Sequence, residues 1–78
     1  MLLWTREEKA NAAHDVWCHW MKYMFSQCER LPDGREVIPA DKARRWIRQM
    51  CMEYEDLPDR EKASDRAIAD RFLRSDNA

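Results

Sequence analysis

This chain of 78 residues contains only one glycine and three prolines, and the positions of these four residues constrain its fold most. Proline and the glycine meet in Leu31-Pro32-Asp33-Gly34, where Asp-Gly is a strong turn signal. Pro39 and Pro58 each stand where a helix can begin, because a first helical turn does not need the missing N–H of proline. The pattern predicts a mainly α domain of three helices, with a short turn or β-ribbon between the first and second.

The first helix is expected over residues 6–28. Thr5-Arg6-Glu7-Glu8 has the form of a capping box, in which the side chains of the first and last residues satisfy each other's backbone N–H groups. Apolar side chains then recur at spacings of three and four, which is typical of one helical face. This stripe, which we expect to face the core, consists of Ala10, Ala13, Trp17, Trp20, Met21 and Met24.

Two further helices are expected after the turn. The second begins at Pro39 and continues to Met52, and the third begins at Pro58 because the residue before a proline is disfavoured in a helix. The predicted buried positions of the second helix are Ala43, Trp46, Ile47 and Met50. Those of the third helix are Ala67, Ile68, Phe72 and Leu73.

Length and charge indicate one soluble domain spanning residues 1–78. The net charge of −1, with 37% charged residues, does not suit a polycation made for nucleic acid. No apolar run approaches the roughly 20 residues that a membrane-spanning helix needs, and residues 1–4 are too few for a signal-peptide core. We therefore expect a cytoplasmic protein without a membrane or nucleic-acid partner.

The cysteines and histidines offer weak signals for chemistry. Cys18, Cys28 and Cys51 are odd in number and lack a CxxC spacing, which favours reduced thiols. His14 and Cys18 could give zinc two ligands, but a hydrogen-bonded histidine beside a thiol is the favoured interpretation. No thiol has a recognisable activating context. We expect no catalytic residue, no metal site and no cofactor.

Two groups of residues remain as candidates for ligand binding. His14 and Trp17 lie one turn apart, and an imidazole beside an indole suits either a core or a clamp for a purine. The basic residues of the second helix, Lys42, Arg44, Arg45 and Arg48, suit either a solvated face or a small phosphate-binding patch. Both interpretations stay open for each group.

Two motifs give the chain a family resemblance. His14-Asp15-Val16-Trp17 is similar to the His-x-x-Trp signature of the ryanodine-receptor repeat domain, and residues 54–67 are similar to its Pro-Tyr-x-x-Leu-x-x-x-Glu-Lys-x-x-Asp-Arg stretch. The chain resembles the small stand-alone versions carried by bacteria and phages. It departs from the family at Glu53, which replaces the usual proline, and it lacks the Gly-Trp-x-Tyr-Gly segment.

The resemblance implies a ligand-binding module and not an enzyme. Tandem repeats of this family form a two-fold arrangement that accepts an adenine-type ligand near the His-x-x-Trp residues, so a single copy is expected to form a homodimer. Related prokaryotic domains look like sensors in nucleotide-signalled defence, and a free-standing copy would suit a phage sponge that sequesters the messenger, a cyclic nucleotide included, in the host cytoplasm. The candidate ligand-binding residues are His14, Trp17, Trp20, Tyr23, Arg45, Arg48, Tyr54 and Arg66.

The main alternative is a protein-binding adaptor or inhibitor that docks on a host enzyme, because surfaces rich in Met and aromatic residues suit adaptable contacts. A DNA-associated accessory protein is disfavoured by the net charge.

Overall fold

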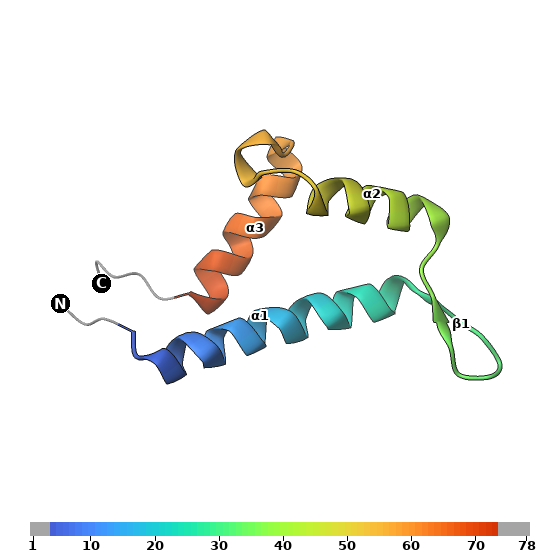
Figure 1. The fold of residues 1–78 in the computed structure, drawn as a ribbon, viewed down its shortest axis with the longest axis horizontal. Helices are drawn as coiled ribbons and strands as arrows, with labels where there is room; N and C mark the ends of the chain where they lie inside the picture. Colours follow the sequence, from blue (N-terminus) through green and yellow to red (C-terminus); the bar gives the residue numbers. More distant parts are fainter. Residues whose placement is uncertain (1–3, 74–78) are drawn as a thin grey trace.

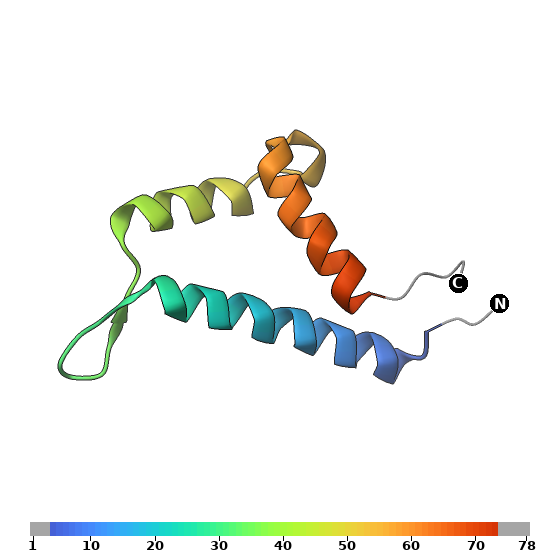
Figure 2. The ribbon, with the colours of Figure 1, turned by 180° about the vertical axis from the view of Figure 1, so that it is seen from behind.

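The computed structural model describes residues 4–73, and they form three helices and one short hairpin. The elements follow in the order α1 (Arg6–Gln27), β1 (Glu29–Arg30), β2 (Glu36–Val37), α2 (Ala40–Met50), the 3₁₀ helix η1 (Tyr54–Asp56) and α3 (Asp59–Phe72). Figures 1 and 2 show α2 and α3 completing an open triangle on the long α1. The predicted mainly α class, with a β-ribbon between the first two helices, is confirmed.

The capping box starts α1 where the sequence predicts it. The Glu8 backbone N–H donates to the Thr5 hydroxyl at 3.1 Å, and the Thr5 backbone N–H donates to Glu8 Oε1 at 3.0 Å. The helix ends at Gln27, because Cys28 adopts an extended conformation that leads into β1. Satisfying these otherwise unpaired N–H groups stabilises the first turn.

The hairpin reverses the chain between α1 and α2. Glu29 pairs with Val37 and Arg30 with Glu36 in an antiparallel register. Gly34 has a φ of 91°, a left-handed conformation that glycine adopts without steric cost. A 2.6 Å ion pair between Arg30 and Glu36 crosses the ribbon, and its hydrogen bond raises the pKa of Arg30.

Pro39 and Pro58 stand immediately before α2 and α3, as expected. Helix α2 ends at Met50, two residues earlier than predicted, and Cys51 donates its N–H to the carbonyls of the last turn. The turn of η1 then redirects the chain into α3. An ion pair of 2.5 Å between Arg48 and Glu61 ties the end of α2 to the start of α3.

The core is small. Among residues 4–73 the only buried residue is Ala12, 5% exposed, where α1 meets α3, and the rings of His19 and Phe72 meet edge to face at 5.8 Å between the same helices. The prediction that the apolar stripes are buried is therefore wrong for several members. Trp17 is 58% exposed, Ile47 57% and Met50 76%; the predicted core positions that are also exposed are Ala10, Ala13, Ala67 and Leu73.

The physical reason is the separation of the helices. The closest helix packing is between α1 and α3, whereas α2 stands away from α1. The molecule measures 51 × 30 × 17 Å, so it is little more than one helix thick. Within residues 4–73, none of the helices combines the length and apolar character that a bilayer crossing requires.

Candidate functional site

A groove of about 930 Å³ lies between the three helices. This volume falls within the range of roughly 300–1,000 Å³ that is typical of small-molecule sites. Helix α1 supplies one wall, α2 the second, and the segment from Leu57 into α3 the third. The lining residues are His19, Trp20, Met21, Tyr23, Met24, Arg45, Trp46, Gln49, Met50, Leu57, Arg60, Glu61, Ser64 and Asp65.

Aromatic rings follow one another across the groove from α1 to α2. His19 meets Trp20 edge to face with centroids 5.1 Å apart, and Trp20 meets Tyr23 in the same way at 6.3 Å. Tyr23 then approaches Trp46 of α2 at 6.1 Å with a tilt of 59°. Because these rings are only partly buried, they retain surface on which a flat ligand can stack.

Two arginines bring positive charge to this aromatic wall. Arg45 comes from α2, and Arg60 comes from the first turn of α3. Neither guanidinium forms an ion pair within residues 4–73. Guanidinium groups bind phosphate oxygens through two parallel hydrogen bonds, so the pair can receive an anionic group.

Glu61 is a charged group enclosed at the wall of the groove, with 9% of its side chain exposed. Its Oε2 accepts a hydrogen bond from Arg48, whereas its buried Oε1 has no hydrogen-bond partner among the described residues. The hydrogen bond from Arg48 lowers the pKa of Glu61, against the opposing effect of desolvation. Gln49, which also lines the groove, lowers the pKa of Glu61 further, so the ionised carboxylate is favoured at the wall.

His14 and Trp17 form a separate surface on α1. Their rings stack with centroids 5.9 Å apart and 21° between the planes, and His14 Nε2 lies 3.3 Å from Cys18 Sγ. Neither His14 nor Trp17 lines the groove, whose α1 residues begin at His19. The candidate residues that were expected to surround one ligand therefore lie on two separate surfaces.

The remaining candidates also lie apart from the groove. Arg48 is held by Glu61, and its Nη1 lies 3.2 Å from Met52 Sδ. Tyr54 is exposed in η1, where the ammonium of Lys62 lies 5.8 Å from the ring centroid. Arg66 is exposed on α3 and does not line the groove. Of the predicted set, the structure brings together Trp20, Tyr23 and Arg45.

Trp46 and Arg60 line the groove but were not among the predicted ligand-binding residues. Trp46 was expected in the core, and it instead completes the row of rings. Arg60 lies within the second family-like motif, but the sequence alone does not indicate that α3 brings it into the same groove as Arg45.

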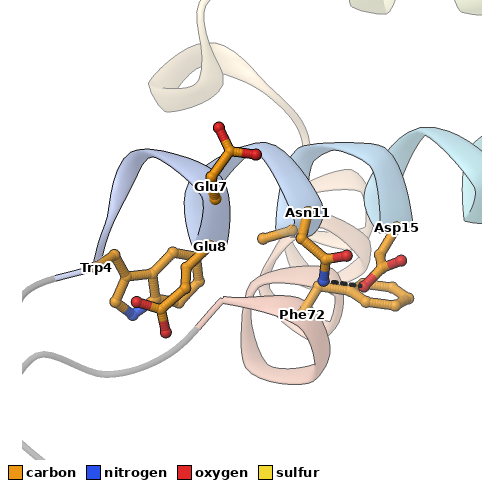
Figure 3. Close-up of a pocket in the computed structure, with 7 residues that line it drawn as sticks. Trp4, Glu7, Glu8, Asn11, Asp15 and Phe72 are labelled. Carbon is orange, nitrogen blue, oxygen red and sulfur yellow. Dashed lines mark hydrogen bonds between the residues drawn. The ribbon is translucent and has the colours of Figure 1, made fainter.

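A second hollow, of about 350 Å³, lies at the start of α1 (Figure 3). Its lining includes three carboxylates, those of Glu7, Glu8 and Asp15, beside the rings of Trp4 and Phe72. Glu8 already serves the capping box, and Asp15 accepts a hydrogen bond from Asn11 at 3.4 Å. This acidic lining does not suit a phosphate-bearing ligand.

Cysteine and metal chemistry give no competing site in the described part of the chain. The thiols of Cys18, Cys28 and Cys51 are free. Between residues 4 and 73, no group of three or more His, Cys, Asp or Glu side chains is arranged to hold a metal ion. No protein-family model, no curated protein and no solved structure matches this chain.

Proposed function

We propose that this protein binds an adenine-containing nucleotide, without catalysing a reaction, in the groove between α1, α2 and α3. The observation that carries the proposal is the row of rings Trp20, Tyr23 and Trp46 with Arg45 and Arg60 beside it. Aromatic faces stack on a purine, and guanidinium groups bind phosphate. The lining of the groove offers both kinds of contact.

The family resemblance supports the biological part of the proposal. A stand-alone ryanodine-receptor-repeat-like module without an effector domain suits a phage sponge that sequesters a nucleotide messenger of antiviral defence. Cyclic adenine nucleotides are the messengers to test first. The protein would act as a homodimer in the host cytoplasm.

A nucleotide panel tests the proposal. Thermal shift and calorimetry should compare linear and cyclic adenine nucleotides with their guanine counterparts. A ligand at 100 times its Kd should stabilise the folded state by about 2.7 kcal/mol and raise the Tm accordingly. Absence of binding to every nucleotide would overturn the proposal.

Arg45→Gln tests the place of binding. Loss of one charge-assisted hydrogen bond, worth about 1.5 kcal/mol, should weaken affinity roughly tenfold. Arg66→Gln is the matched control, because Arg66 is exposed on α3 outside the groove and its removal should leave affinity unchanged. Equal loss in both variants would contradict binding in the groove.

A protein-binding adaptor is the second candidate function, and the exposure of Ile47 and Met50 on α2 favours it. Its test is a purified complex of fixed stoichiometry with a host enzyme. Met50→Lys should abolish that complex, whereas Phe25→Lys, at an exposed position of α1 that does not line the groove, should preserve it.

A further inference from the structure

The surface of one chain is too large for a compact protein of its mass. The accessible area is 6660 Å², whereas a compact monomer of 9.5 kDa exposes about 5,000 Å². The radius of gyration is 15.6 Å, against about 11–12 Å for a compact chain of this length. The excess of roughly 1,600 Å² is about twice what one partner buries in a standard interface, and it falls in the range of obligate homodimers.

The uncovered surface includes the apolar stripe of α2. Ala43, Trp46, Ile47 and Met50 follow the spacing of a helix that buries one face, and α2 is the most strongly amphipathic of the three helices. Yet Ile47 and Met50 are more than half exposed, and Ile47 does not line the groove. A nucleotide in the groove would leave Ile47 uncovered, so a larger partner is needed.

The charges beside this stripe are self-complementary. Helix α2 carries four basic residues and one acidic residue. The segment that follows it, residues 53–65, carries six acidic and two basic residues. Because the two regions are consecutive, a two-fold axis near their junction lays the basic helix of each copy over the acidic segment of the other.

We infer that a second copy of this chain closes the groove, with the α2 stripe of each protomer packed against the groove and the acidic segment of its partner. This inference extends the proposed function. It rests on that proposal in one respect, because it takes the groove to be the functional surface. The partner covers Met50 and Ile47 and also covers the open side of the row of rings. The binding site is then complete only in the dimer.

The first test measures the mass of the wild-type protein without nucleotide. Sedimentation and light scattering in the micromolar range should give twice the 9.5 kDa of one chain. A folded, helical monomer at these concentrations would overturn the inference. Since no nucleotide is present, a dimer that later fails the nucleotide panel would refute the proposed function and leave this inference standing.

The second test locates the interface. Met50→Lys should shift the protein to monomers at concentrations where the Phe25→Lys control remains dimeric, because both side chains are exposed but only Met50 belongs to the α2 stripe. A Met50→Lys protein that dimerises as tightly as the wild type would rule out this surface.

A charge exchange covers the case in which Met50→Lys does not fold. Arg44→Glu and Asp65→Arg should each weaken self-association about tenfold, because each places like charges across the interface twice. Mixing the two variants should restore dimers, which native mass spectrometry would show as heterodimers. If a wild-type dimer forms but the mixed variants do not pair, the proposed crossing of α2 over residues 53–65 is refuted.

Discussion

At the scale of single residues, Trp17 shows how exposure separates a core residue from a binding residue. Its indole is 58% exposed and stacks on His14, so Trp17→Ala removes little packing. We expect the free energy of unfolding to fall by less than about 1 kcal/mol, measured by urea denaturation at fixed protein concentration. Trp20→Ala, which breaks the row of rings in the groove, should cost at least twice as much.

The same Trp17→Ala variant distinguishes the two candidate surfaces. If the nucleotide binds in the groove, the variant should retain wild-type affinity. Loss of binding with unchanged helicity would move the site to the His14–Trp17 surface. A variant that unfolds would show that Trp17 supports the fold and would contradict the stability prediction above.

Glu61 gives a prediction for pH. The hydrogen bond from Arg48 lowers its pKa in the folded state, so the folded protein releases this proton more readily than the unfolded chain. The resulting stabilisation is present above the unfolded pKa of about 4.3 and is lost as the pH falls through the lower folded value. Glu61→Gln should therefore flatten the fall of Tm below about pH 5. Glu55→Gln, at an exposed position of η1, should retain it.

At the scale of elements, the hairpin depends on the backbone of Gly34. Its φ of 91° is strained for other residues, although an added Cβ would meet nothing within 4 Å. Gly34→Ala should thus destabilise the protein by about 1 kcal/mol through the backbone alone. Gly34→Asn should cost less, because Asn tolerates this region. Equal urea midpoints for the alanine variant and the wild type would contradict this account.

Local signals made the elements predictable, whereas the packing between them was not. The capping box at Thr5, the Asp33-Gly34 turn and the prolines before α2 and α3 act over a few residues, so the sequence located each boundary closely. The choice of helix face is nonlocal. Because α1 is apolar on more than one side, periodicity alone did not show that Ala12 and His19 meet α3 while Trp17 faces outward.

The candidate site was predictable only in part for the same reason. Trp20, Tyr23 and Arg45 could be predicted from residue type alone, because aromatic rings can stack on a base and guanidinium groups can bind phosphate wherever they lie in the fold. Spacing on α1 could not separate these rings from the His14–Trp17 pair without knowing where α3 lies. Arg60 becomes a candidate only once the fold shows that the start of α3 lines the groove.

At the scale of the whole molecule, Ala12 is the only buried residue among residues 4–73, so one chain has little core of its own. If the second copy supplies the missing burial, folding and association are coupled and the Tm must rise with protein concentration. For two chains of this length we expect about 4 °C for each tenfold increase, measured by circular dichroism without nucleotide. The Phe25→Lys protein should show the same slope. A wild-type Tm that does not change with concentration would mean that the open triangle of helices is stable as a monomer, and the groove would then need no second copy to close it.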